Sequence, residues 1–336
     1  MQEVRSILEQ LKQPNYRYQQ FLKAWYSELI TDLNDITAWP KSLREQVSSN
    51  VSIMPLIKVK ELISAKGDTI KVLLKRKSDG QSFEAVLMKH RDGRNTVCVS
   101  CMIGCPVGCS FCATGKMGFR GNLTATEIVE QVLYFARILK TSKERVSNVV
   151  FMGMGEPMLN LIEVEEAIKR LTDEQMLGLS DKRITVSTSG YVEQLKILIR
   201  HGFKGRLAIS LHAPNQKLRE SLMPVAKNHS LKDLFRVLDD YESVSNKRIS
   251  YEYILIKGVN DRPQDAHDLV KLLTNRLAHV NLIPYNRIKG VDFKTSGADS
   301  IQKFRDILDR GGIHNTIRIT MGSDVAAACG QLAGGE

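Results

Sequence analysis

Residues 98–124 of the chain, CVSCMIGCPVGCSFCATGKMGFRGNLT, contain the cysteine pattern that decides the fold. Within this stretch Cys105, Cys109 and Cys112 follow the spacing C-x₃-C-x₂-C. Three thiolates on one short loop can bind three irons of a four-iron cube and leave the fourth iron without a protein ligand. An iron without a protein ligand is open to a small molecule. The spacing therefore predicts a [4Fe-4S] cluster that takes part in chemistry rather than in electron storage alone.

Two other uses of cysteine compete with this interpretation. Structural zinc takes four closed ligands, usually as two separated pairs, and the nearest spare thiols here are Cys98 and Cys101. A disulfide framework is the second alternative, but six cysteines in 336 residues are too sparse to cross-link a chain of this length. The spacing favours the cluster and leaves zinc as the main competitor.

The amino-terminal residues MQEVRSILEQLKQ scatter charges of both signs through their apolar positions, which is typical of neither a secretory leader nor a transit peptide. No apolar run in the sequence approaches the length of a membrane span. We therefore expect a cytoplasmic protein with no membrane partner, in a compartment where thiols stay reduced.

The net charge of +11 and the isoelectric point near 9.3 favour a polyanionic partner. The excess is denser at the front, because residues 1–97 carry 16 basic and 11 acidic side chains. A merely soluble surface gives such numbers about as often as nucleic-acid binding does. Charge alone therefore does not identify the partner.

Periodicity divides the chain into a helical front and a longer α/β part. Residues 1–60 have the apolar spacing of helices. Residues 68–90 alternate apolar and polar side chains on both sides of Asp79 and Gly80, so they predict two strands joined by a tight turn. Together these segments predict a small helical domain with an appended strand pair.

From about residue 95 onward, short apolar runs alternate with helical patterns. The runs of strand length are NTVCVSC, SNVVFM, RITVST, RLAISL, ISYEYILI, HVNLIP and NTIRITM. Helix starts between them include Thr124 with Glu127, which fits a capping box, and Asn160 with Glu163, which resembles one. Six or seven βα units are fewer than the eight of a closed barrel. The pattern therefore predicts an α/β fold with a parallel sheet and a partial, right-handed (β/α)₆-type barrel.

Small and polar residues follow several of these strands. In a parallel βα array they meet at the carboxyl edge of the sheet, where ligands bind. The segments in question are Gly153-Met154-Gly155-Glu156-Pro157, Ser187-Thr188-Ser189-Gly190, Ser210-Leu211-His212 and Asn286. Taken singly, the glycines are typical of a tight turn and a lone histidine at such a position is typical of packing.

In chain order, the motifs resemble the RlmN and Cfr family of radical S-adenosylmethionine (radical SAM) RNA adenine methyltransferases over nearly the whole length. The matching stretches are the cysteine segment at residues 98–124, VVFMGMGEPMLN, ITVSTSG, LAISLHAPN, HVNLIPYN and AACGQLAG. The resemblance implies that the cluster ligands are Cys105, Cys109 and Cys112. It also implies that SAM is surrounded by Gly155, Glu156, Ser187, Ser210, Leu211, His212 and Asn286.

The resemblance further implies a mechanism that uses two SAM molecules per turnover. Carbon 2 of adenine is an electron-poor carbon, so a polar methyl transfer has no nucleophile and a radical route is needed. Cys329 would receive a methyl group from one SAM, and the second would supply the radical that removes a hydrogen from it. Glu84 would accept the ring proton, and Cys98 would release the product by a transient disulfide with Cys329. Cys101 departs from the family pattern of a small hydroxyl residue, and it is a second thiol that competes for this disulfide.

The resemblance implies three parts of the chain and their partners. Residues 1–90 would form an accessory RNA-binding domain of helices with a β-hairpin, residues 91–324 the radical SAM core, and residues 325–336 a mobile segment carrying Cys329. Pro157 favours the RlmN type, which methylates carbon 2, over the Cfr type, which modifies carbon 8. The implied substrates are 23S rRNA and the tRNA adenosine next to the anticodon. We expect a monomer that takes electrons from a reducing donor such as flavodoxin.

Two readings from other classes remain open. A ferredoxin-like electron carrier would need the cluster but neither Glu84 nor Cys329, and it would normally supply a fourth cysteine. An RNA-binding scaffold without catalysis would bind RNA and show no turnover. Neither of them requires the ordered series of motifs at the strand ends.

Overall fold

Seven parallel strands form the centre of the fold in a computed structural model that describes residues 2–334. They lie side by side in chain order, and at least one helix links each strand to the next. The strands are β4 (Asn95–Cys98), β7 (Asn148–Phe151), β8 (Ile184–Thr188), β9 (Arg206–Ser210), β10 (Ile249–Leu255), β11 (Ala278–Pro284) and β12 (Asn315–Ile317). The final strand β12 pairs only with β11 among the described strands, so the barrel stays open. This confirms the partial barrel.

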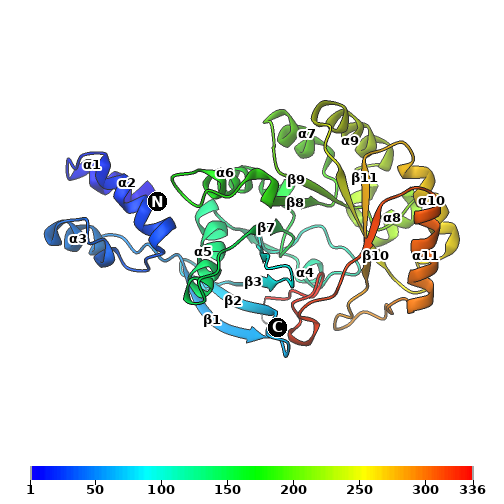
Figure 1. Ribbon diagram of the computed structural model, residues 1–336, viewed down its shortest axis with the longest axis horizontal. Helices are drawn as coiled ribbons and strands as arrows, with labels where there is room; N and C mark the ends of the chain where they lie inside the picture. The colour runs from blue at the N-terminus through cyan, green and yellow to red at the C-terminus, as the bar shows by residue number, and fades with distance from the viewer. Residues whose placement is uncertain (1, 335–336) are drawn as a thin grey trace.

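The connecting helices cover the outer face of the sheet (Figure 1). Tyr251 of β10 stacks on Phe235 of one helix, and Tyr253 packs against Phe304 of another. Since side chains alternate along a strand, Glu252 points to the opposite, inner face. The main helices are α5 (Ala125–Thr141), α6 (Leu161–Thr172), α7 (Val192–Arg200), α8 (Gln216–Leu222), α9 (Leu231–Ser245), α10 (Pro263–Leu273) and α11 (Ala298–Arg310), with the shorter helices α4 (Ala113–Lys116), η3 (Pro157–Asn160), η4 (Asp181–Arg183), η5 (Pro224–Lys227) and η6 (Ser323–Val325).

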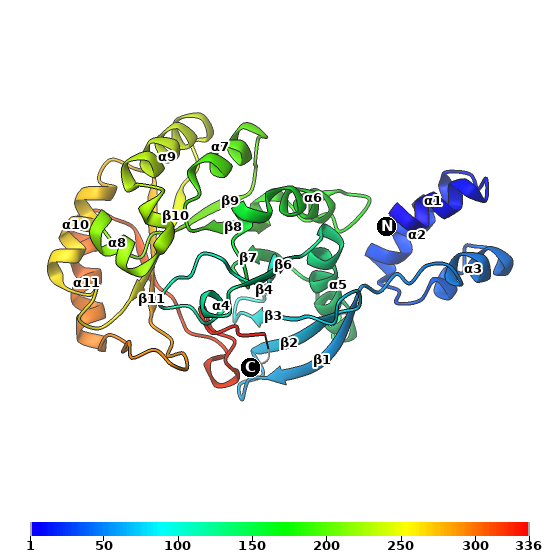
Figure 2. The same cartoon turned by 180° about the vertical axis from the view of Figure 1, so that it is seen from behind.

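The front helices form a lobe at one end of the molecule, set apart from the barrel in both views (Figure 1, Figure 2). Arg137 of α5 connects the lobe to the barrel, since its guanidinium lies over the Trp25 ring and donates to the Leu29 carbonyl oxygen at 3.1 Å. The elements of the lobe are α1 (Gln2–Gln10), α2 (Tyr16–Lys23), η1 (Ala24–Glu28), η2 (Leu33–Asp35) and α3 (Lys41–Ser48). The helical character predicted for this segment is confirmed up to α3.

Three antiparallel strands extend the parallel sheet beyond β4: β1 (Leu56–Ile63), β2 (Thr69–Arg76) and β3 (Ser82–Lys89). The sequence predicted β2, β3 and their turn, but it assigned β1 to the helical front, which was wrong. The apolar residues of LIKVKELI also fit a helical period, and on this edge strand Ile57 and Val59 stay 47% and 52% exposed. The sheet continues without a break across residue 90. The division into three parts stays a prediction.

The predicted capping box at α5 is present, with the Thr124 and Glu127 side chains each bonded to the other's backbone N–H. The one suggested at Asn160 is absent, so that prediction was wrong. The Asn160 amide instead donates to the carbonyl oxygens of Cys101 and Leu123, both at 2.8 Å. Glu163 accepts from a backbone N–H at the start of α5. Tertiary contacts have taken both side chains away from the helix end.

The carboxyl-terminal segment folds back across the open side of the barrel, and its last described residues lie beside β2 and β3 (Figure 2). The Ala113 N–H donates to the Gly330 carbonyl oxygen at 2.8 Å, and the Thr114 hydroxyl donates to that of Leu332 at 2.7 Å. In this structure the segment is therefore docked, while its predicted mobility stays a prediction. Residue 1 of the first predicted part and residues 335–336 of the third lie outside the described residues. Between residues 2 and 334, no helix is both long and apolar enough to span a membrane.

Candidate active site

A cavity of about 1080 Å³ lies on the open side of the barrel, between the ends of β4, β7 and β11 and the carboxyl-terminal segment. Its wall includes residues from the predicted site and one that was not predicted: Cys98, Cys112, Gly153, Asn286, Cys329 and Arg318. Segments that are far apart in the chain thus bring three cysteines, Cys98, Cys112 and Cys329, to one space.

The cysteine loop follows β5 (Met102–Gly104), which pairs with β6 (Phe119–Asn122) in a small second sheet that sequence analysis missed. Gly104 has φ of +70°, and a Cβ at this position would lie 1.8 Å from the Gly118 carbonyl oxygen, so only glycine fits. The Cys112 N–H donates to the Cys109 carbonyl oxygen at 3.2 Å and closes the loop. The loop packs in an apolar cluster of Val107, Phe111, Ala213, Leu222, Met223, Val225, Ile254, Ile256 and Tyr285.

The three loop thiols have the chemistry of cluster ligands. Burial raises the pKa of each, to about 12 for Cys105, and the neighbouring sulfurs add to the effect. Cationic iron would lower these pKa values again, because it stabilises the thiolate form of each cysteine that binds it. Among residues 2–334 no three His, Cys, Asp or Glu side chains are placed to hold a single metal ion. Each iron of a cube takes one thiolate, so its cysteines need not meet at one point.

The glycine-rich turn after β7 packs against the cysteine segment. A Cβ on Gly155, which has φ of +104°, would lie 2.6 Å from the Met102 Cβ, and one on Gly153 would lie 2.6 Å from the Val99 carbonyl oxygen. Glu156 is buried beside this turn, and burial raises the pKa of its carboxyl. Its Oε2 accepts from the Ser189 N–H and hydroxyl at 2.7 and 2.6 Å, and Oε1 accepts from the Met158 N–H. The Thr188 side chain also hydrogen-bonds to this carboxylate, and these hydrogen bonds oppose the effect of burial on its pKa.

Arg219 of α8 holds the ends of β8 and β9 together and is a site residue that the sequence did not indicate. Its side chain is fully buried and donates to the carbonyl oxygens of Ser189, Ser210 and Leu211. Burial lowers its pKa to about 10, against the opposing effect of Cys109 and Glu156. Its Nη1 has no hydrogen-bond partner among the described residues. An unpaired buried donor is costly, and a carboxylate beside the cluster loop would satisfy it.

The other residues predicted around SAM follow β8, β9 and β11. In the part of the chain that the structure describes, no hydrogen bond involves the hydroxyl of Ser187 or Ser210, so both stay available to a ligand. Leu211 is fully buried. The Asn286 amide donates to the Cys329 carbonyl oxygen at 3.1 Å, so Asn286 contacts the carboxyl-terminal segment directly. Of the residues predicted around SAM, the cavity wall includes Asn286 but not Glu156, Ser187, Ser210 or His212.

His212 is a structural bridge between strands in this structure. Its Nδ1 accepts from the Ile254 N–H at 3.1 Å, and its ring lies edge-on to Phe111 with centroids 4.8 Å apart. Burial lowers its pKa to about 3, with Arg219 adding to the shift. The side chain is therefore a neutral acceptor at physiological pH, and the backbone of this residue, with φ of +57°, supports the turn.

We expect His212 to make the fold sensitive to acid. Because its pKa falls from 6.5 to about 3 on folding, the stability that it confers is complete above pH 6.5 and is lost progressively between pH 6.5 and 3. At pH 5 the loss is about 2 kcal/mol of the free energy of unfolding. His212→Asn, which tolerates positive φ, should show a smaller fall in melting temperature than the parent between pH 8 and 5. Equal falls in both proteins would contradict the assignment.

Cys98, at the end of β4, lies near Cys329. Burial raises the pKa of Cys98 to about 12, and the nearby Cys329 is the next cause. Cys101 is also buried, but the charged neighbours that raise its pKa are Glu156 and Cys105, and it does not line the cavity. All six cysteines are free thiols in this structure. The geometry favours Cys98 over Cys101 as the thiol that faces Cys329.

Glu84 lies on β3 beneath the carboxyl-terminal segment. Its Oε1 is 2.8 Å from the Lys71 ammonium, and its Oε2 accepts from the Ala333 N–H at 2.8 Å. Lys71 also donates to the Ala326 carbonyl oxygen at 3.2 Å. Lys71 is buried although it is charged, because the docked segment covers this part of the sheet. A buried ion pair therefore fixes Glu84.

The comparisons with known proteins agree with this geometry. A family model described as the radical SAM superfamily matches residues 99–272. The chain is 41% identical to "Ribosomal RNA large subunit methyltransferase N" of Nitrosopumilus maritimus, covering 98% of this chain and 96% of the relative. It is 43% identical to "Probable dual-specificity RNA methyltransferase RlmN" of Gloeobacter violaceus, covering 98% and 92%. The solved radical SAM methyltransferase from Sphaerobacter thermophilus matches with a TM-score of 0.95 and 41% identity, over 98% of this chain and 96% of the other.

Proposed function

The chain belongs to the radical SAM superfamily and, within it, to the RlmN family of RNA methyltransferases, and we propose that it methylates carbon 2 of adenosine in 23S rRNA and in tRNA beside the anticodon. The observation that carries the proposal is the placement of Cys329, Cys98 and Cys112 in the wall of one cavity. A methyl carrier, a thiol that can release the product and a ligand of the cluster thus share a single space. We further propose a cytoplasmic monomer that takes its electrons from a donor such as flavodoxin.

The residues of this chain fit both cofactors. Cys105, Cys109 and Cys112 would hold the cluster, and Glu156 and Arg219 would hold the amino and carboxylate groups of SAM. The unpaired Nη1 of Arg219 supplies a donor for the carboxylate, and the buried Glu156 carboxylate supplies negative charge for the ammonium. When bound, the cluster and SAM together supply one-electron chemistry that generates a carbon radical.

Cys329 would carry the methyl group, with two SAM molecules consumed per turnover. Its thiol would accept a methyl group from the first, and that methyl group would lose one hydrogen to the radical chemistry that the second would supply. Asn286 holds the Cys329 carbonyl oxygen, and Gly330 with φ of +83° follows directly. Glycine allows the backbone beside Cys329 to adopt more than one conformation, while the hydrogen bond from Asn286 restrains the position of Cys329.

The carbon radical on Cys329 would add to carbon 2 of the base, and the adduct would then lose one electron to the oxidised cluster and its carbon 2 proton to Glu84. Lys71 supplies the partner charge for the Glu84 carboxylate. Cys98 would then attack the sulfur of Cys329. A disulfide forms, the carbon–sulfur bond to the base breaks, and the released carbon takes a proton to become the methyl group. An external thiol reductant restores both thiols.

Carbon 8 methylation, as in the Cfr type, is the alternative outcome. Pro157 supports carbon 2, since the Cfr type is expected to have alanine after the glutamate. In this structure Pro157 begins η3 and the Glu156 side chain accepts from the Met158 N–H. This residue bears on the position of the modification and not on the radical chemistry.

Nucleoside mass spectrometry tests the proposal. The cluster-loaded enzyme is incubated without oxygen with methyl-deuterated SAM, a reductant, and either 23S rRNA or tRNA. We expect adenosine methylated at carbon 2 with two methyl deuteriums, because one of the three is removed from the methyl group on Cys329. Methylation at carbon 8 would reassign the type. Three retained deuteriums would contradict the route through Cys329.

A further inference from the structure

The positive charge at the front of the chain lies on the antiparallel strands and not on the helices. Residues 1–55 carry six basic and six acidic side chains, whereas residues 56–94 carry ten basic and five acidic. Phosphate binding depends on local excess charge. The front helical lobe has none, so the RNA-binding role that its sequence suggested finds no support in its charge.

Strand register places two lysines on the same face of the sheet as Glu84. Leu73 of β2 pairs with Glu84 on one side and with Lys60 of β1 on the other, and Lys75 lies two residues further along β2. Directly paired residues share a face, as do residues two apart in a strand. Since neighbouring strands are about 4.8 Å apart, Lys60 lies about 10 Å from Glu84 across the sheet.

Both lysines are exposed and have no ion-pair or hydrogen-bond partner within residues 2–334. The carboxyl-terminal segment covers Lys71 and Glu84 on this face but leaves β1 uncovered. Ile57, opposite Lys75, is 47% exposed between them. This face thus combines unpaired positive charge with exposed apolar surface, and it adjoins the part that the segment covers at Lys71 and Glu84.

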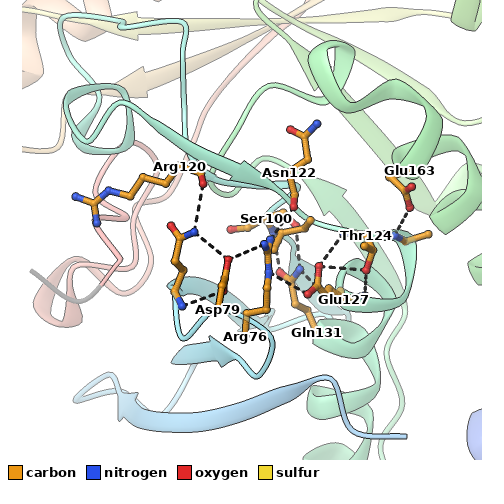
Figure 3. A network of polar contacts seen from close by, with 12 residues as sticks. Arg76, Asp79, Ser100, Arg120, Asn122, Thr124, Glu127, Gln131 and Glu163 are labelled. Carbon is orange, nitrogen blue, oxygen red and sulfur yellow. Dashed lines mark hydrogen bonds and ion pairs between the residues drawn. The ribbon is translucent and has the colours of Figure 1, made fainter. Parts of the chain in front are cut away.

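A network of polar contacts joins the turn between β2 and β3 to a second hairpin, formed by β5 and β6 (Figure 3). Arg76 pairs with Asp79 at 3.1 Å and with Glu127 at 3.0 Å, and it donates to the Asn122 carbonyl oxygen of β6 at 2.6 Å. The network therefore joins the β2–β3 turn to the β5–β6 hairpin. That hairpin presents Phe119 with 51% of its surface exposed. Exposed aromatic rings and unpaired lysines are the groups that bind single-stranded nucleic acid.

We propose that Lys60 and Lys75, with Phe119 on the adjoining hairpin, bind the single-stranded RNA that flanks the target adenosine. This rests on the proposed function, since it takes the RNA substrate from it. The lysines contact phosphates, and Phe119 stacks on a neighbouring base. The strand then runs along the sheet face toward Glu84 and leaves the target base to enter the cavity.

Salt-dependent binding tests the surface. The cluster-loaded enzyme is titrated without oxygen with a stem-loop RNA that has an adenosine in its loop, at several salt concentrations. A plot of log K against log salt has a negative slope, and each lost phosphate contact reduces the size of this slope by about 0.7. Lys60→Gln/Lys75→Gln should therefore reduce it by about 1.4. Phe119→Ala should weaken binding about tenfold and leave the slope unchanged.

Two matched controls separate this face from other charge. Lys58 lies on the same strand but pairs with Leu74, so it faces the opposite side, and Lys58→Gln should keep the slope. Lys23→Gln/Lys41→Gln removes equal charge from the helical lobe and should also keep it. Melting temperatures verify that each variant is folded.

The outcomes are distinct. A parental slope in Lys60→Gln/Lys75→Gln, while the parent binds and methylates RNA, would overturn the surface and leave the proposed function standing. An equal reduction of the slope in Lys23→Gln/Lys41→Gln would assign the phosphate contacts to the helical lobe, and it would also overturn the proposed surface. A parent that neither binds nor methylates RNA would remove the proposed function and this inference together.

Discussion

Cys329→Ala is expected to abolish methylation of RNA, by at least about 1,000-fold, because it removes the sulfur that is proposed to carry the methyl group to the base. Cys98 and Cys112, the other thiols of that wall, have different roles in the proposal. The measurement is methylated adenosine per enzyme, by mass spectrometry of digested RNA. Labelled methyl on the enzyme, followed by peptide mass spectrometry, should vanish in parallel.

The matched control is Cys101→Ala, which removes a thiol from the same region of the sequence. Cys101 is buried away from the cavity wall, so this variant should keep methylation within a few-fold of the parent. Normal turnover by Cys329→Ala would refute the methyl carrier and, with it, the two-step route. It would leave the family assignment intact.

Cys98→Ala is expected to stop after a single round and to accumulate enzyme covalently joined to RNA. The methylene group on the Cys329 sulfur bonds to the base carbon as before, but the thiol proposed to attack that sulfur is gone and Cys112 is a proposed cluster ligand. The adduct should appear as a band of reduced mobility in denaturing gels and should collapse on digestion with ribonuclease. The amount of adduct should approach one molecule for each molecule of cluster-loaded enzyme.

The double variant Cys98→Ala/Cys329→Ala supplies the control, because it has lost the sulfur that forms the bond and should give no adduct. Cys101→Ala should behave like the parent. An adduct in Cys101→Ala and none in Cys98→Ala would exchange the roles of the two thiols. Multiple turnovers without adduct in Cys98→Ala would show that an external thiol releases the product.

The sequence predicted the parallel core well because apolar runs of strand length alternate with helices there. It failed at β1, where an edge strand keeps apolar side chains exposed and the pattern fits two periods. It also failed at Asn160, whose side chain bonds to the residue just before β5 and the residue just after β6 instead of capping α6. In both places contacts between distant segments decide the structure, and local patterns do not record them.

The candidate site also contains residues that local sequence patterns indicate and residues that only tertiary contacts reveal. The spacing of Cys105, Cys109 and Cys112 indicated the cluster loop without any structure, because ligand spacing is a local property. Arg219 carried no such signal, since an arginine on a short helix is usually exposed. Its role depends on three carbonyl oxygens from two strand ends, which only the folded chain brings together.

The carboxyl-terminal segment that carries Cys329 also occupies Glu84, through the Ala333 N–H, and Lys71, through the Ala326 carbonyl oxygen. While these contacts last, no base can reach the Glu84 carboxylate. In the proposed mechanism, a displacement that carries Cys329 outward would free the Glu84 carboxylate in the same movement. Methyl carrier and proton acceptor would then become available to the base together, and both would be covered again when the segment docks.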